Sequence, residues 1–142
     1  MRILIQRVRE ASVTIDAQLY SSIGKGLLVL VGIEDADTEE DVACLCGKLL
    51  KLRIFDDEAG VMNCSAEDVG ADILIVSQFT LHASTRKGNR PSYIRAARPE
   101  KAIPFYEAFI AAVRQGATGK VETGRFGADM QVDQRRPGHH LD

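Results

Sequence analysis

Short apolar runs separated by polar turns fill the first third of the chain and predict a series of strands. Residues 2–8 alternate, with Ile3 and Ile5 on one side, and residues 12–15 and 18–20 continue the pattern. Residues 27–33 are apolar almost throughout, which is typical of a strand at the centre of a sheet. We therefore expect a meander of strands with short connections. Such a meander excludes a doubly wound nucleotide-binding fold, which requires helices between its strands.

Two helices are predicted from apolar residues at helical spacing. Thr38 and Asp41 have the spacing of a capping box, and the helix behind them is expected to end near Arg53 or Phe55. The second helix follows Pro99, with a kink or a later start possible at Pro104. The apolar positions are Val42, Leu45, Cys46, Leu49 and Leu50 in the first helix, and Ala102, Phe105, Tyr106, Phe109, Ile110 and Val113 in the second.

The remaining elements are a short strand over residues 62–64, a buried strand over 72–76, a long loop over 82–98 and closing strands from Val121 to residue 132. A loop as long as 82–98 is uncommon in a compact domain unless it is functional or disordered. The chain of 142 residues shows no linker or repeat, so we expect one domain, 1–142, of the α/β (α+β) class.

The N-terminal sequence, the net charge and the cysteines indicate the cellular location of the protein and the ligands it can bind. The apolar start of the chain is interrupted by Arg7 and is too short for a signal-peptide core or a membrane span, so we expect a cytoplasmic protein that does not bind membranes. The net charge of −2 means that binding of nucleic acid requires a local basic patch. Cys44, Cys46 and Cys64 lack the spacing of a zinc site, and we interpret them as reduced core cysteines with no metal.

Polar side chains appear where the 72–76 strand ends. Because side chains alternate along a strand, we expect Gln78, Thr80 and His82 to share one face, and a Thr hydroxyl beside an imidazole is typical of a nucleophile and its base. No third group that would orient His82 is evident from the sequence. The alternative is a strand that reaches the surface, with its hydroxyl groups bonded to nearby backbone.

A basic segment follows. It contains Arg86, Lys87, Arg90, Arg95, Arg98 and Lys101. This cluster indicates a phosphate backbone as ligand, and Tyr93 is placed to stack on a base. A solvated loop whose charge serves solubility remains the alternative. The acidic residues at 34–41 precede and begin a predicted helix, where negative charge interacts favourably with the positive end of the helix dipole. We therefore predict a structural role for them.

Several motifs, in order from residue 1 to about 132, carry a family resemblance. They are Gln6-Arg7-Val8, Gly26-Leu27-Leu28-Val29-Leu30-Val31-Gly32, Arg53-Ile54-Phe55, Met62-Asn63, Ser77-Gln78-Phe79-Thr80-Leu81, Arg90-Pro91-Ser92 and Gly124-Arg125-Phe126-Gly127-Ala128-Asp129-Met130-Gln131-Val132. With these motifs the chain resembles the D-aminoacyl-tRNA deacylases, and Ser-Gln-Phe-Thr is one of that family's two signatures.

The resemblance implies a homodimeric, β-barrel-like α/β domain with antiparallel and mixed sheets and no cofactor. It implies hydrolysis of the ester between a D-amino acid, or mischarged glycine, and the 3′-terminal adenosine of tRNA. Ser77, Gln78, Phe79 and Thr80 would line the pocket at the ribose and ester, and Met130 would lie by the adenine. Either the Thr80 hydroxyl is a nucleophile, or backbone amides of this stretch polarise the carbonyl with help from the substrate's 2′-hydroxyl. The basic residues Arg86, Lys87 and Arg90 would contact the tRNA backbone.

The second family signature, Asn-x-Gly-Pro-Val-Thr, is absent. In the family its Gly-Pro peptide enters the partner's pocket and excludes L-amino acids, held by the residue that matches Arg7. Here the region reads Asp133-Gln134-Arg135-Arg136-Pro137-Gly138-His139-His140-Leu141-Asp142. Pro137-Gly138 reverses the order of the two residues and is not an equivalent of Gly-Pro. An impaired or non-catalytic tRNA-binding module is therefore the alternative function.

A shift of reading frame explains the tail. The codons CTG ACC AAC GAC GGC CCG GTC ACC ATC TGG encode Leu-Thr-Asn-Asp-Gly-Pro-Val-Thr-Ile-Trp. Reading from the last base of the first codon gives Asp-Gln-Arg-Arg-Pro-Gly-His-His-Leu, the sequence of residues 133–141. Our hypothesis is a small deletion or a sequencing error that displaced the family's C-terminal frame.

Overall fold

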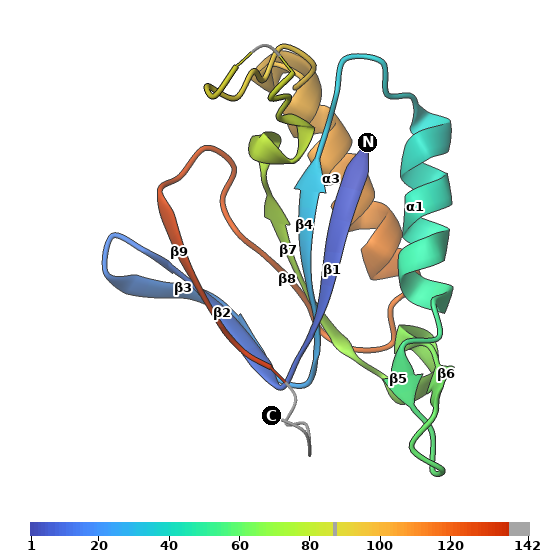
Figure 1. Cartoon of the computed structure of the whole chain (residues 1–142). Coiled ribbons are helices and arrows are strands. Elements are labelled where there is room, and N and C mark those ends of the chain that lie inside the picture. The colour runs from blue at the N-terminus through green and yellow to red at the C-terminus, as the bar shows by residue number, and fades with distance from the viewer. Residues whose placement is uncertain (87, 137–142) are drawn as a thin grey trace.

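Two β-sheets and two long helices make up most of the structure, a computed structural model that describes residues 1–86 and 88–136 (Figure 1). The first sheet has the order β1-β4-β7-β8. Its strands are β1 (Arg2–Val8), β4 (Gly26–Gly32), β7 (Asp72–Ser77) and β8 (Val121–Thr123). Strand β1 is antiparallel to β4, whereas β4, β7 and β8 run parallel.

The second sheet is antiparallel and has the order β3-β2-β9. It consists of β2 (Glu10–Ile15), β3 (Gln18–Ile23) and β9 (Met130–Arg135), while β5 (Phe55–Asp56) and β6 (Met62–Cys64) form a separate hairpin. The helices are α1 (Glu39–Lys51), α2 (Ala66–Val69), α3 (Pro99–Gly116) and a 3-10 turn, η1 (Phe79–His82).

Local sequence signals account for the ends of the long helices. Asp41 accepts a hydrogen bond of 2.8 Å from the backbone N–H of Thr38, and this bond lowers the pKa of Asp41. Helix α1 ends at Lys51, slightly earlier than predicted. Helix α3 starts at Pro99 itself. Proline is tolerated at the first position of a helix, because the backbone N–H that it lacks would have no acceptor within the helix there. The later start considered at Pro104 is wrong.

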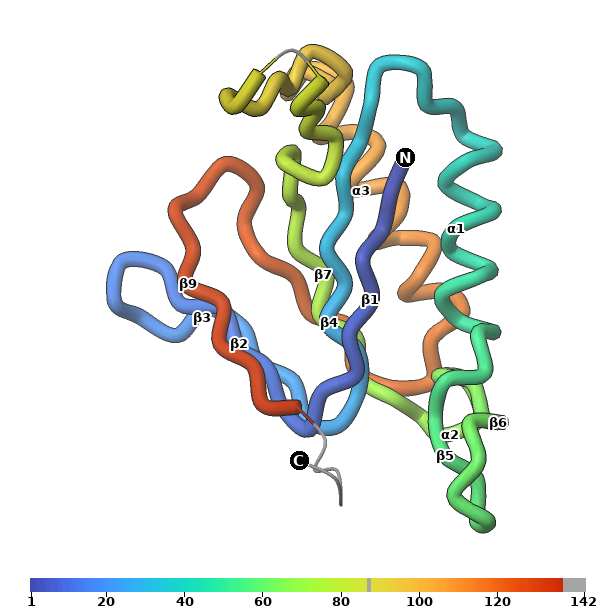
Figure 2. The backbone as a smooth tube through the Cα atoms, in the orientation of Figure 1, coloured from blue at the N-terminus to red at the C-terminus, as the bar shows by residue number. Residues whose placement is uncertain are grey.

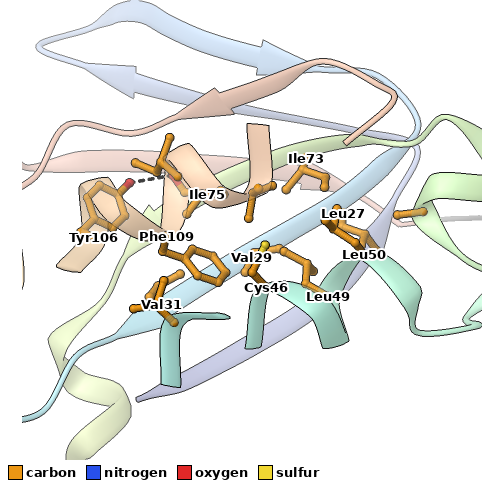
Figure 3. Packing of buried hydrophobic residues seen from close by; sticks show 14 of the residues in the cluster. Leu27, Val29, Val31, Cys46, Leu49, Leu50, Ile73, Ile75, Tyr106 and Phe109 are labelled. Atoms are coloured by element: carbon orange, nitrogen blue, oxygen red, sulfur yellow. Dashed lines mark hydrogen bonds between the residues drawn. The ribbon is translucent and has the colours of Figure 1, made fainter. Parts of the chain in front are cut away.

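The two central strands of the first sheet, β4 and β7, are buried on both faces. On β4 and β7, Leu27, Val29, Ile73 and Ile75 face α1 and α3, where they pack with Leu49, Phe109 and other core residues (Figure 3). The alternate residues Leu28, Leu74 and Val76 face the second sheet and pack with Val8, Val13 and Ile23. Burial on both faces is why β4 and β7 appear in the sequence as continuous apolar runs rather than alternating ones.

The pairing of the first four strands differs from the predicted meander. Strand β1 pairs with β4, and only β2 and β3 form a hairpin, because the chain passes from the first sheet into the second at Arg9. Among the described residues the sheets do not close into a barrel, so the α/β class is confirmed but the barrel-like closure is not.

Helices do join parallel strands later in the chain, since α1 lies between β4 and β7 and α3 between β7 and β8. Both pack on the same face of the first sheet, so the fold is not doubly wound (Figure 1). Helix α2 was not among the elements predicted from the sequence. It forms because the Asp68 carboxylate accepts the Ser65 N–H at 2.9 Å and the Ser65 hydroxyl accepts the Asp68 N–H at 3.1 Å. In the described part of the chain, no helix has the length and apolarity needed to span a membrane.

Candidate active site

Strand β7 ends at Ser77, and the chain then turns into η1. The N–H of Gln78 still donates to the Val31 carbonyl at 2.8 Å, after which Phe79–His82 coil into a 3-10 turn. The predicted alternation of faces through Gln78, Thr80 and His82 is therefore wrong beyond the strand end. A turn at this point exposes short stretches of backbone that a continuing strand would pair.

A pocket of about 510 Å³ opens at this strand end, between the two sheets and the start of α3. Its polar lining residues are Ser77, Gln78 and Asp129, and its aromatic ones are Phe79 and Phe126. Met130 also lines it. The remaining lining is Val31, Ile33, Val76, Ala97, Pro99, Ala102, Gly127, Ala128 and Val132. A mostly apolar pocket with a few polar groups at one side is typical of a small-molecule site.

The Met130 side chain packs closely against the backbone of Gly124. A Cβ atom on Gly124 would lie 2.6 Å from the Met130 sulfur, so a larger residue there would require the flexible Met130 side chain to shift. The Gly124 N–H donates to the Ile75 carbonyl at 3.0 Å and ties this wall of the pocket to β7. Of the predicted site residues, Ser77, Gln78, Phe79 and Met130 thus line one pocket.

Thr80 stands beside the pocket and is bonded to Gln78. The Gln78 side-chain amide donates to the Thr80 hydroxyl oxygen. The first two N–H groups of a 3-10 turn have no acceptor within the turn. Those of Phe79 and Thr80 also make no other hydrogen bond among the described residues. Within the described residues, the site therefore offers a hydroxyl oxygen that accepts one hydrogen bond and two main-chain donors without a partner.

His82 does not act on Thr80. Its side chain is buried, with Nδ1 3.4 Å from a Glu34 carboxylate oxygen, and its ring nitrogens have no well-formed hydrogen bond within the described residues. The predicted Thr80–His82 dyad is wrong for this reason. Glu34, which sequence analysis assigned to a structural acidic series, is the neighbour that orients the imidazole. The two residues are 48 positions apart, so no local pattern links them.

Glu34 also holds the segment that follows η1. Its carboxylate lies 3.2 Å from a guanidinium nitrogen of Arg95, and its backbone pairs with Ala96. Arg86 and Arg90 are exposed on this loop, as the predicted contact with a phosphate backbone requires, and Lys87 lies outside the described residues. Phe79 and Tyr93 form an edge-to-face aromatic pair with ring centroids 5.0 Å apart.

Arg7 and the C-terminal tail lie at the other end of the sheets. Arg7 pairs with Leu27 at the start of β4, whereas Ser77 pairs with Val31 near the end of β4. The Arg7 guanidinium donates to the Ile54 carbonyl at 3.0 Å. Arg7 thus takes no part in the pocket of its own chain. Figure 2 shows the last described residues at this same end, away from the loop that follows β7.

The first residues of the unusual tail continue β9. Asp133, Gln134 and Arg135 pair with Ser12, Ala11 and Glu10 of β2. Arg136 is exposed and lies within 2.7 Å of the Gln6 side chain, once the Gln6 amide is oriented to accept. Pro137 and Gly138, the rest of the predicted chiral-selection region, lie outside the described residues. The strand continues because sheet hydrogen bonds use the backbone and tolerate a change of exposed side chains.

The cysteines are free, and burial raises the pKa of the Cys46 thiol. Cys44 is exposed, so its prediction as a core residue is wrong. Within residues 1–86 and 88–136, no three His, Cys, Asp or Glu side chains are grouped to hold a metal ion.

This fold and this strand-end pocket place the chain in a class of solved α/β domains. It is similar to a structure titled c-Myc DNA Unwinding Element Binding Protein, with a TM-score of 0.90, 39% identity, and coverage of 95% of this chain and 91% of the other. A probable eukaryotic D-amino acid tRNA deacylase has the same fold, with a TM-score of 0.82 at 20% identity over 96% and 94% of the two chains.

The sequence identifies the family within that class. Residues 4–139 match the family described as D-Tyr-tRNA(Tyr) deacylase. A D-aminoacyl-tRNA deacylase of Flavobacterium johnsoniae is 60% identical over 97% of this chain and 92% of its own length. One from Akkermansia muciniphila is 58% identical over 93% and 88%. The chain belongs to the D-Tyr-tRNA(Tyr) deacylase family.

Proposed function

We propose that this protein hydrolyses the ester that joins a D-amino acid to the 3′-terminal adenosine of tRNA and releases the free D-amino acid and tRNA. The observation that carries the proposal is the pocket at the end of β7, where Ser77, Gln78 and Phe79 face Met130, in a chain of this family. The named relatives support the substrate class. They do not support the alternative of a non-catalytic tRNA-binding module.

The free N–H groups of Phe79 and Thr80 support a main-chain mechanism. Ester hydrolysis develops negative charge on the carbonyl oxygen, and donors aimed at that oxygen stabilise the transition state. No base accompanies the Thr80 hydroxyl among the described residues, because His82 faces Glu34 instead. The proposed roles are therefore polarisation of the carbonyl by these amides, with water as nucleophile and the substrate's 2′-hydroxyl assisting. Gln78 holds Thr80 in place.

Apolar and basic groups would contact different parts of the rest of the substrate. Met130 and the apolar wall would contact the adenine, and the exposed Arg86 and Arg90, with Lys87, would contact the tRNA backbone. Glycine mischarged on tRNA is proposed as a second substrate. A pocket that admits the side chain of a D-amino acid also admits glycine, which has no side chain. We further propose a single catalytic domain, 1–142, that acts in the cytoplasm as a homodimer, in which Arg7 faces the partner.

The test is loss of the ester from D-tyrosyl-tRNA and L-tyrosyl-tRNA, followed as released amino acid over time. Hydrolysis of D-tyrosyl-tRNA well above the rate without protein is expected. Gly124→Ala, whose added Cβ would lie 2.6 Å from the Met130 sulfur, should lower the rate of this hydrolysis by displacing Met130. Gly47→Ala is the matched control, since its Cβ in α1 meets nothing within 4 Å. Binding of tRNA without any acceleration of ester loss would instead establish the non-catalytic module.

A further inference from the structure

Two large aromatic side chains lie exposed together at the mouth of the pocket. Phe79 is 58% exposed and Tyr93 is 37% exposed, and their rings meet edge to face at 5.0 Å with an interplanar angle of 73°. We call this pair the aromatic rim. Phe79 lines the pocket and Tyr93 lies beyond it. Apolar groups gathered at the surface beside a pocket mark a contact with a ligand, since their exposure to water is unfavourable.

The loop that carries Tyr93 is held in place on both sides. Ser84 and Ser92 exchange two backbone hydrogen bonds of 2.8 and 2.7 Å just before Tyr93. After it, Ala97 donates to the Ile33 carbonyl at 2.9 Å, and Arg95 pairs with Glu34. The rim is thus positioned before any ligand arrives, and binding need not order it. A preorganised surface of this kind retains more of its contact energy as affinity.

The loop segment around Tyr93 is rich in arginine, with the Glu34 carboxylate beside Arg95 as an opposing charge. The exposed arginines of this segment are Arg86, Arg90, Arg95 and Arg98. Residues 83–99 contain no Asp or Glu. Aromatic rings flanked by cations are the pattern that binds single-stranded nucleic acid, because the rings stack on bases while the cations neutralise phosphates. A second copy of this surface would carry the same charge and would be repelled by it.

We propose that the aromatic rim stacks the base of the nucleotide that precedes the 3′-terminal adenosine, so that the pocket takes the adenosine and its ester while Phe79 and Tyr93 take the next base. This subsite rests on the proposed function for its substrate. It assigns Tyr93 a role in recognising the single-stranded end of tRNA. Such stacking tolerates any base, so the subsite would serve all tRNA species with their shared CCA end.

The first test measures binding without catalysis. The trinucleotide CCA and free adenosine are titrated by calorimetry into the wild-type protein and into Tyr93→Ala. We expect wild type to bind CCA more tightly than adenosine, and Tyr93→Ala to weaken CCA binding by about 5-fold to 100-fold. Adenosine affinity should not change. Tyr93→Phe should retain CCA affinity, and Met62→Ala, which removes an exposed apolar side chain from β6, is the control.

The second test separates KM from kcat. Tyr93→Ala should raise KM for D-tyrosyl-tRNA by a similar factor and leave kcat unchanged, while both constants for D-tyrosyl-adenosine stay at their wild-type values. Unchanged CCA affinity, or an equal loss for CCA and adenosine, would overturn the proposal. So would a change of oligomeric mass in Tyr93→Ala with CCA binding intact, since the rim would then be an interface between copies.

The two proposals fail separately. If the wild-type protein binds CCA more tightly than adenosine through Tyr93 but hydrolyses no D-aminoacyl ester, the stacking subsite is supported and the proposed function is wrong. If the ester is hydrolysed and Tyr93→Ala does not change the affinity for CCA, the stacking subsite is wrong and the proposed function is supported.

Discussion

The imidazole of His82 is buried against the carboxylate of Glu34, with 3.4 Å between Nδ1 and the nearer oxygen. Glu34 also reaches Arg95 at 3.2 Å, so one carboxylate connects η1 to the basic loop. Glu34→Ala should lower the free energy of unfolding by about 0.5–1 kcal/mol, because it removes the carboxylate beside the buried imidazole and the ion pair with Arg95. It should also reduce kcat by displacing η1.

Chemical denaturation and single-turnover kinetics measure these two effects. Glu107→Ala, which removes an exposed carboxylate from α3, is the control and should change neither. A Glu34→Ala protein with wild-type stability and kcat would show that the pair does not position the site.

Gly32 allows η1 to pack on β4. A Cβ there would lie 3.0 Å from His82 Cδ2, 3.0 Å from Leu81 Cβ and 3.1 Å from the Gln78 carbonyl oxygen. Gly32→Ala should therefore displace η1, lower stability by about 1–3 kcal/mol and lower kcat/KM on D-tyrosyl-tRNA. Gly47→Ala is the matched control, since its Cβ meets nothing within 4 Å in α1 and alanine favours the helix.

Thr80→Val distinguishes the hydroxyl from the backbone amide. If the amides polarise the ester, kcat/KM should remain within a few-fold of wild type, with stability reduced by about 0.5–1.5 kcal/mol through loss of the bond from Gln78. Thr80→Ser keeps the hydroxyl and serves as control. A fall of three orders of magnitude in Thr80→Val alone would assign the nucleophile to Thr80.

Tyr106 ties α3 to the strand that leads into the site. Its hydroxyl donates to the Ile75 carbonyl at 2.8 Å (Figure 3), and burial raises its pKa. A raised pKa in the folded state means that the contribution of Tyr106 is present below about pH 10, the unfolded value, and is lost as the pH rises further. The free energy of unfolding should thus decline above about pH 10, and Tyr106→Phe should make that decline shallower. Equal slopes in both proteins would contradict the assignment.

The tail predicts a defect in chiral selection. With residues 133–142 as they stand, the Gly-Pro peptide is missing, so we expect weakened protection of L-tyrosyl-tRNA or low activity overall. Replacing these residues with Leu-Thr-Asn-Asp-Gly-Pro-Val-Thr-Ile-Trp should restore a high ratio of D to L hydrolysis. Brisk D hydrolysis with full protection of the L substrate by the unaltered chain would contradict this.

The origin of the tail has a direct test in the gene. Resequencing the coding DNA should recover the Asn-Asp-Gly-Pro-Val frame within the region of codons 133–142. If no reading frame there encodes it, the hypothesis of a shifted frame is wrong.

Local patterns in the sequence determined the helices and the buried strands. Apolar spacing and caps predicted α1 and α3, and apolar runs predicted β4 and β7, because these signals act between residues a few positions apart. The signature Ser77-Gln78-Phe79-Thr80 likewise indicated where the site lies. Of these four residues, the first three line the pocket and Thr80 stands beside it.

Only the tertiary structure decided which strands pair and which residues meet at the site. Periodicity tells which face of a strand is buried but not which strand lies beside it, so the pairing of β1 with β4 was missed. The contacts of Glu34 with His82 and of Phe79 with Tyr93 join elements that are distant in sequence or separated by a loop without periodicity. Such contacts form when whole sheets and helices pack together, and no pattern within one segment encodes them.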